Sequence, residues 1–192
     1  MQRFSFSKGS EKTRFMGIIN ISPNSFYEKS RCLSIEDVMK LAEKMVNDGA
    51  DFLDLGAESS RPGSKPISEQ EELSKLIPVI SYLVKRIDVP ISIDTYKPTV
   101  AKEALLAGAK IINDITGLQT YSEMAEVISR HQAAVIAMHM KGTPMTMQEN
   151  PNYKNVVEDV KIFLTNSIKI CEAAEIDPDQ IAVDPGIGFG KN

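Results

Sequence analysis

The chain has 192 residues, of which 42% are hydrophobic and 25% charged, with a formal net charge of -4. This is the composition of a globular domain with a sizeable core, and its acidic balance without a basic stripe excludes nucleic acid and anionic membranes as main partners. The apolar runs are too short to span a membrane. Cys32 and Cys171 lie outside any CxxC spacing and no leader of the export type is recognisable, so we expect a cytoplasmic protein.

Short apolar runs alternate with helical patterns along the chain. Residues 1–14 are polar and basic with one Phe-Ser-Phe alternation, and we expect a short edge strand or a plug there. Apolar runs bounded by turn formers indicate strands. They are predicted at 15–21, 51–55, 90–93, 110–113, 133–138 and 181–184.

Helices are predicted between these strands, because apolar residues recur there at helical spacing. Ser34, Ser68 and Ser122 are predicted to cap three of them. Pro98 suits a first helical turn, whereas Pro78 is expected to kink the second helix. The predicted helices run from the caps or first turns at 34, 68, 98, 122 and 156 to about 48, 87, 107, 128 and 171.

Six strands in strict alternation with five helices predict an α/β fold with a parallel sheet and right-handed crossovers. The segments 49–54 and 108–113 both contain a helix stop, a small residue and a strand, as stacked β/α units do. A closed (β/α)8 TIM barrel takes about 250 residues. We therefore predict one barrel domain over 1–192 that is incomplete, with about six of its eight β/α units and without the C-terminal two.

Polar side chains end three of the predicted strands. Asp94 ends ISID, Asn113 ends KIIN and Asp184 ends IAVD. Because the carboxyl ends of parallel strands form the active sites of α/β enzymes, we expect one polar pocket there. Carboxylates and an amide suit a ring that carries N–H donors. Taken singly, each residue is equally well explained as a structural cap.

Two further positions are candidate ligands. Asn20 ends the first strand with an amide oxygen of the kind that binds magnesium, although a turn asparagine is the alternative. The loop 58–63, ESSRPG, offers hydroxyls and a guanidinium that suit a carboxylate or a phosphate, or it is simply a solvated loop. The tail 186–191, GIGFGK, lacks the spacing of a Walker loop.

Six motifs, in order, resemble those of the dihydropteroate synthases, the pterin-binding barrels of folate biosynthesis that sulfonamides target. They cover the whole chain and read MGIINISPNSF, DLGAESSRPG, SIDTYKP, GAKIINDITG, MHMKGTPMTMQENPNY and DPGIGFGKN. The resemblance implies condensation of (7,8-dihydropterin-6-yl)methyl diphosphate with 4-aminobenzoate, which gives 7,8-dihydropteroate and diphosphate. It also implies Mg2+ as cofactor and a homodimer.

The resemblance implies roles for particular residues. Those that hold the pterin or line its pocket would be Asp94, Asn113, Met138 and Asp184. Those that shape the aminobenzoate pocket would be Ser60, Arg61 and Pro62. Asn20 would meet magnesium and diphosphate, and Asn24 and Arg61 would act in catalysis.

Two departures from the family pattern keep alternatives open. Asn24 replaces an aspartate of the family's first loop, and a neutral amide cannot offset a developing positive charge. The family's later lysine and arginine motifs belong to its last two strands, which these residues do not include, so we expect weak or no activity, low stability and self-association from the 192 residues alone. The alternatives are a non-catalytic pterin-binding fragment and a corrinoid-linked methyltetrahydrofolate methyltransferase. The ESSRPG loop disfavours the methyltransferase.

Overall fold

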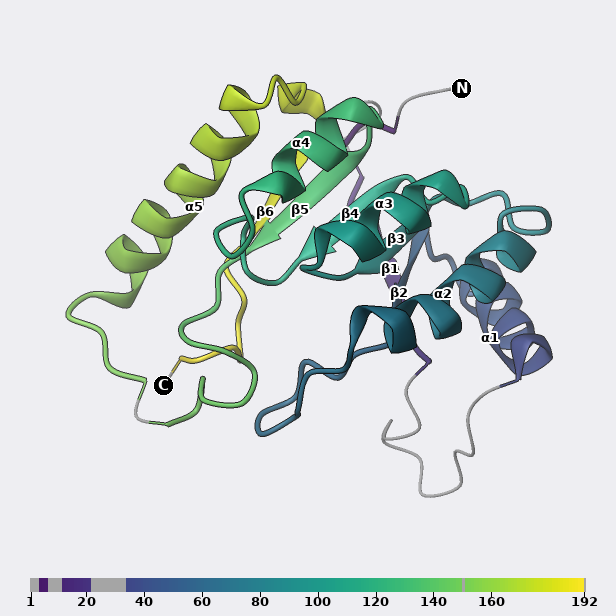
Figure 1. The fold of residues 1–192 in the computed structure, drawn as a ribbon, viewed down its shortest axis with the longest axis horizontal. Helices are drawn as coiled ribbons and strands as arrows, with labels where there is room; N and C mark the ends of the chain where they lie inside the picture. The colour runs from purple at the N-terminus through teal and green to yellow at the C-terminus, as the bar shows by residue number, and fades with distance from the viewer. Residues whose placement is uncertain (1–3, 7–11, 22–33, 150, 192) are drawn as a thin grey trace.

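Six parallel strands form a single curved sheet in the order β1-β2-β3-β4-β5-β6 (Figure 1). The structure is a computed structural model that describes residues 4–6, 12–21, 34–149 and 151–191. Every strand bound lies within one residue of its prediction. The strands are β1 Met16–Asn20, β2 Phe52–Gly56, β3 Ile91–Asp94, β4 Ile111–Asp114, β5 Ala134–Met138 and β6 Ile181–Asp184.

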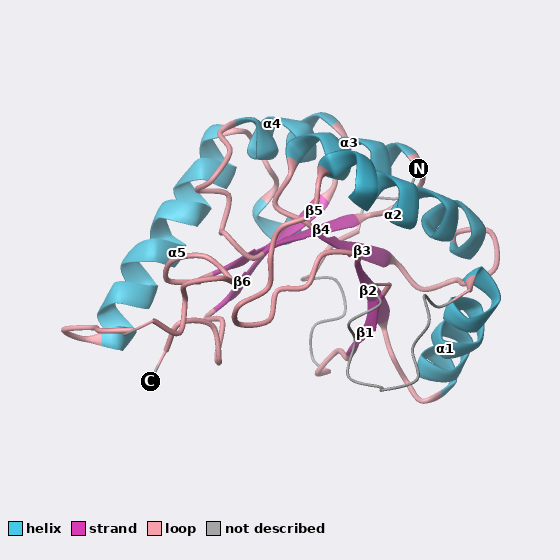
Figure 2. Cartoon of the chain, turned by 60° about the horizontal axis from the view of Figure 1, so that its bottom comes forward, coloured by secondary structure: helices cyan, strands magenta, loops and turns pink. Residues whose placement is uncertain are grey.

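Five α-helices connect the strands and form an outer arc around the sheet (Figure 2). The predicted α/β alternation is therefore confirmed, and the curvature is that of a TIM-barrel type fold, of which the described residues supply six strands and five α-helices. No described helix combines the length and the hydropathy that a membrane crossing requires. The helices are α1 Ile35–Asn47, α2 Glu69–Leu83, α3 Pro98–Leu106, α4 Glu123–Arg130 and α5 Val156–Ala173, with a 3-10 turn, η1, at Pro178–Gln180.

Two of the three predicted serine caps are confirmed. The hydroxyls of Ser34 and Ser68 each accept a hydrogen bond from a backbone N–H in the first turn of α1 or α2. The prediction for Ser122 was wrong, because this residue has helical backbone angles and its hydroxyl bonds the carboxylate of Glu123 instead. Pro78 lies inside α2 without ending it.

The sheet buries apolar side chains on both faces. Successive residues of a strand point to opposite sides, so Leu53 and Leu55 face the helices and join the main core. Phe52 and Ile111 face the concave side, where they form a second apolar layer with alternate residues of β5 and β6. The described segment 4–6 packs its phenylalanines against this layer and has no strand geometry, as the plug predicts for these three residues.

The two outer strands, β1 and β6, each pair with only one neighbour among the described residues. Ile18 of β1 is 55% exposed and Val183 of β6 is 45% exposed, although both lie in strands. Unpaired edges with apolar side chains favour pairing with another chain.

We therefore expect the 192-residue chain to self-associate, and the double variant Ile18→Lys/Val183→Lys to be more monomeric, because charged edges resist strand addition. Sedimentation velocity over a range of concentrations checks this. Leu106→Lys is the control, since Leu106 is 62% exposed but lies on α3, away from both edges. A wild-type chain that stays monomeric at the highest concentration would contradict the expectation.

Candidate substrate site

Above its apolar layer the concave face becomes polar. Asp54 of β2 and Asn113 of β4 lie two residues beyond Phe52 and Ile111, so their side chains point to the same side. Asn113 Nδ2 donates a hydrogen bond to Asp54 Oδ2 over 3.1 Å. The remaining oxygens, Asp54 Oδ1 and Asn113 Oδ1, are buried without a partner in the described part of the chain. An unsatisfied buried acceptor costs about 1–3 kcal/mol, so this layer is suited to a ligand that donates hydrogen bonds.

The strand ends bring three of the predicted residues into one row. The backbone register pairs Asn20 with Gly56, Gly56 with Asp94, and Asp94 with Asn113. A Cβ added at Gly56 would lie 3.4 Å from Asp94 Oδ2 and 3.6 Å from Asn20 Oδ1. The amide of Asn20 and the carboxylate of Asp94 thus both lie over Gly56, where a Cβ would make ordinary contact with each.

Met138 and Asp184 face each other across β5 and β6, further toward the strand ends. Both lie an even number of residues beyond positions of the concave apolar layer and so share its face. Met138 is buried in a small cluster at the top of the sheet. Asp184 Oδ1 accepts the backbone N–H of Gly186 over 2.7 Å, which fixes the carboxylate at the mouth of the site.

Burial sets the electrostatics of this site. It raises the pKa of Asp94 well above its ordinary value, and the negative charges of Asp54 and Glu72 raise that pKa further. Burial likewise raises the pKa of Asp54. The side chains of Ser92, its register partner on β3, and Asn113 lower the pKa of Asp54 in part. The oxygens of Asp54, Asp94 and Asn113 still outnumber these donors on the concave face, which favours a ligand edge made of N–H groups.

The three residues predicted for the aminobenzoate pocket lie on the loop 57–67, between β2 and α2. Ser60 and Asp94 line one small cavity of about 10 Å3, so the loop reaches the row of polar strand ends. Arg61 and Pro62 lie in the turn beyond, where the carbonyl of Arg61 accepts the backbone N–H and the hydroxyl of Ser64. Catalytic candidate Asn24 falls outside the described residues.

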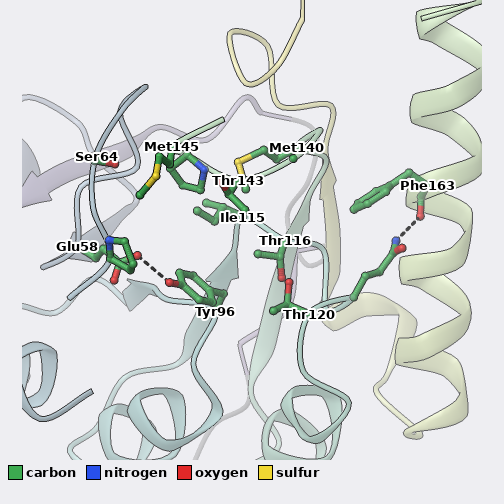
Figure 3. Close-up of a pocket in the computed structure, with 14 residues that line it drawn as sticks. Glu58, Ser64, Tyr96, Ile115, Thr116, Thr120, Met140, Thr143, Met145 and Phe163 are labelled. Atoms are coloured by element: carbon green, nitrogen blue, oxygen red, sulfur yellow. Dashed lines mark hydrogen bonds between the residues drawn. The ribbon is translucent and has the colours of Figure 1, made fainter. Parts of the chain in front are cut away.

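A larger cavity of about 400 Å3 is lined by residues of other elements (Figure 3). Glu58 and Tyr96, joined by a hydrogen bond of 2.9 Å, stand on one side of it, and Phe163 of α5 stands on the other. The described lining does not include Asp94 or Asn113. This cavity therefore adjoins the loop 57–67 and does not replace the strand ends as the candidate site.

Sequence reasoning missed two features of the site. Asp54 was passed over as part of a strand, although a carboxylate within the apolar run FLDLG signals a buried partner or ligand. Lys97 is almost wholly buried between Glu58 and Glu72, which are distant in the sequence. Only the position of Lys97 directly before Pro98 and after a polar strand end hinted at a role.

Asp94 gives a pH-dependent test of this electrostatic account. Because its folded-state pKa is raised, its contribution to stability is complete below the unfolded pKa of about 4 and is lost as pH rises through the folded pKa. Asp94→Asn removes this titration. We expect the variant to be more stable than wild type by about 1 kcal/mol at neutral pH, with the difference vanishing near pH 4.

Urea unfolding at both pH values measures the effect. Asp48→Asn is the control, because Asp48 is exposed and paired with Lys44 on α1. An Asp94→Asn variant that is less stable than wild type at neutral pH would contradict the account.

Comparison with known proteins adds an independent finding. The family model described as "Pterin binding enzyme" matches residues 16–192. The dihydropteroate synthase of Bacillus subtilis is 42% identical over 181 residues, which are 94% of this chain and 61% of that protein. The chain thus spans about three fifths of the length of this relative.

Two solved structures share the fold. One is a Burkholderia cenocepacia dihydropteroate synthase complexed with 7,8-dihydropteroate, with a TM-score of 0.82 and 41% identity over 95% of this chain and 61% of that one. The other is the Thermus thermophilus enzyme in complex with 4-aminobenzoate, with a TM-score of 0.81 and 39% identity over 95% of this chain and 64% of that one.

Proposed function

Because this chain belongs to the pterin-binding enzyme family, we propose that it carries the pterin site of a dihydropteroate synthase. The observation that carries the proposal is the concave face, where Asp54 and Asn113 each hold a buried oxygen that has no partner among the described residues. Asp94 adds a half-buried carboxylate of raised pKa at the strand ends. A reduced pterin presents an edge of ring and exocyclic N–H groups, which would satisfy such acceptors.

Each polar residue would have a distinct part in holding the pterin. The amide nitrogen of Asn113 is engaged by Asp54, so its oxygen is turned toward the ligand as an acceptor. Asp94 and Asp184 would accept N–H groups from the two sides of the ring. Met138 supplies an apolar surface against which the flat ring can pack.

The chemistry requires positioning and electrostatics more than a strong base. In the proposed reaction the bond between the pterin methylene and the diphosphate oxygen breaks, and a bond from the arylamine nitrogen to that carbon forms. The arylamine then loses a proton to solvent. The departing diphosphate leaves a delocalised cation, which the buried carboxylates on the concave face would stabilise.

The loop 57–67 would hold the second substrate. The relative from Thermus thermophilus has a structure with 4-aminobenzoate, and Ser60 here touches the same small cavity as Asp94. We assign Ser60, Arg61 and Pro62 to the aminobenzoate pocket, with the Arg61 guanidinium suited to the carboxylate of that substrate or to diphosphate. A catalytic part for Asn24 stays a prediction.

Magnesium is proposed as the cofactor, with Asn20 as its protein ligand. No group of three His, Cys, Asp or Glu residues that could hold a metal occurs in the described segments. Magnesium commonly uses one or two protein oxygens together with water and substrate phosphate, so a single amide oxygen beside Asp94 fits this mode. When bound, the ion would neutralise charge on the diphosphate.

The assembly and location are further proposals. The open edges of β1 and β6 support a homodimer or closure by further β/α units, and the acidic composition supports a cytoplasmic enzyme that acts on small molecules. Both stay predictions.

Calorimetry with a reduced pterin tests the substrate assignment. Losing a charged hydrogen-bond partner costs about 1.5–3 kcal/mol, so Asp184→Ala should weaken binding about 10-fold to 150-fold. Asn113→Ala should also weaken it, since the buried Asp54 then loses its partner. Glu126→Ala serves as the control, because it only removes an exposed pair with Arg130 on α4.

Equal pterin affinity in Asp184→Ala, Asn113→Ala and wild type would overturn the assignment. A synthase assay on the natural gene product separates the candidate functions. Formation of 7,8-dihydropteroate supports the synthase, whereas pterin binding without product supports the non-catalytic alternative.

The proposed magnesium site predicts a dependence on the diphosphate group. Removing magnesium with EDTA should weaken binding of the pterin methyl diphosphate but leave the pterin without diphosphate unaffected, because Asn20 would meet the ion and not the ring. Asn20→Ala should reproduce the selective loss in the presence of magnesium. Calorimetry with both ligands checks this, and an equal loss for both would place Asn20 at the ring instead.

A further inference from the structure

We propose that Lys97 is a positioning residue that clamps the loop 57–67 over the strand end carrying Asp94, and thereby sets the affinity for the second substrate. The proposal rests on the proposed function, which assigns this loop to aminobenzoate. The clamp itself is defined by hydrogen bonds and ion pairs in the structure. It joins the base of the loop to α2 and to the start of α3.

Lys97 uses all three of its ammonium hydrogens in the clamp. Its Nζ lies 2.6 Å from Glu58 Oε2, 2.6 Å from Glu72 Oε2 and 2.8 Å from the carbonyl oxygen of Ile67. The side chains of Lys97, Glu58 and Glu72 are 7%, 11% and 1% exposed. Burial disfavours the charge of Lys97, but its hydrogen bonds to the two glutamates outweigh this and raise its pKa. The ammonium therefore stays charged.

Glu58 completes the clamp from the other end of the loop. Its Oε2 also accepts the backbone N–H of Ile67 over 2.9 Å, and its Oε1 accepts the hydroxyl of Tyr96 over 2.9 Å. The first and last turns of the loop are thus tied to one ammonium group, since Lys97 and Glu58 hold the C=O and N–H of Ile67. These hydrogen bonds fix the distance between the two ends of the loop.

Between these ties Ser64 holds the loop to itself, because its hydroxyl donates to the carbonyls of Ser59 and Arg61. Pro62, Gly63 and Lys65 are exposed, and the backbone N–H of Gly63 donates to the carbonyl of Pro144 in another loop over 3.0 Å. The clamp is therefore the element best placed to fix the orientation of Ser60 and the residues after it.

The clamp also holds the loop next to the row of polar strand ends. Lys97 follows Asp94 by three residues, and Glu58, Glu72, Ser60 and Asp94 line one small cavity. The negative charges of both glutamates contribute to the raised pKa of Asp94. A buried ion pair is weak evidence for stability, because apolar residues of similar volume often serve as well. Positioning is the better explanation of why three charges are buried here.

The proposal predicts that removing Lys97 impairs the use of aminobenzoate much more than the binding of the pterin. In Lys97→Met of the natural gene product, kcat/KM for aminobenzoate should fall on the order of 100-fold, mainly through KM, as expected for misplacement of a positioning loop. Pterin affinity should change by far less than this, since Lys97 itself hydrogen-bonds the loop and α2 and not Asp94, Asn113 or Asp184. Lys97→Arg should recover part of the loss, because its guanidinium can reach the same acceptors.

Lys75→Met is the matched control. It removes the ion pair on α2 in which Lys75 Nζ lies 2.7 Å from Glu71 Oε1, and this pair is more exposed than the clamp. Both kinetic constants should be unchanged.

Hydrogen exchange of the ligand-free chain tests the clamp without any activity. In Glu58→Gln, which preserves side-chain volume, amides of the loop 57–67 should exchange at least tenfold faster than in wild type while those of α2 are unchanged. The proposal is overturned if loop and α2 exchange rise together in Glu58→Gln, or if KM and pterin affinity change in parallel in Lys97→Met.

These outcomes separate the two proposals. Faster loop exchange in a chain that binds no pterin would overturn the proposed function and leave the clamp standing. Pterin binding and turnover with unchanged loop exchange and unchanged aminobenzoate KM would overturn the clamp alone.

Discussion

The alternation of side chains along six parallel strands is the constraint on which the rest of the structure depends. Every second residue points to the concave side. That face runs from the apolar layer of Phe52 and Ile111, closed below by residues 4–6, to a polar layer with Asp54 and Asn113. Moving any strand by one residue would send its polar side chains into the apolar contact with the helices. The same register that builds the core therefore builds the site.

The polar layer is held at a cost in stability. Asp54 is buried and Asp94 half-buried, the pKa values of both are raised, and Asp54 Oδ1 and Asn113 Oδ1 have no partner within the described chain. Such an arrangement persists only because the surrounding strands and helices hold it in place. In contrast, Lys97 meets its two glutamates at hydrogen-bond distance, which neutralises much of the charge beside the site. The site thus combines a satisfied network that orients a loop with an unsatisfied one that is suited to a ligand.

Much of the fold was predictable because local signals agreed. Short apolar runs ended by turn formers located all six strands, and the alternation with helices required a parallel sheet. Asp94, Asn113 and Asp184 were predicted to share one pocket because each ends a strand, with Asn20 as a separate candidate. The register places Asn20, Asp94 and Asn113 in one row and pairs Asp184 with Met138 further along the sheet. The predicted cap at Ser122 was wrong, because its backbone is helical and its hydroxyl makes no capping hydrogen bond. Asp54 and the pairing of Lys97 with Glu72 were not predictable, since they depend on contacts between residues far apart in the chain.

The central claim is that the acceptors of the concave face bind the N–H edge of a reduced pterin. The most direct measurement is calorimetry of pterin binding in two buffers of different ionisation enthalpy, from about pH 5 to 8. Donors from the ring would favour the charged form of Asp94 and lower its raised pKa, so binding should release protons and the enthalpy should depend on the buffer. Asp94→Asn should abolish that dependence. Pterin binding without proton release at any of these pH values, in wild type and variant alike, would contradict the account.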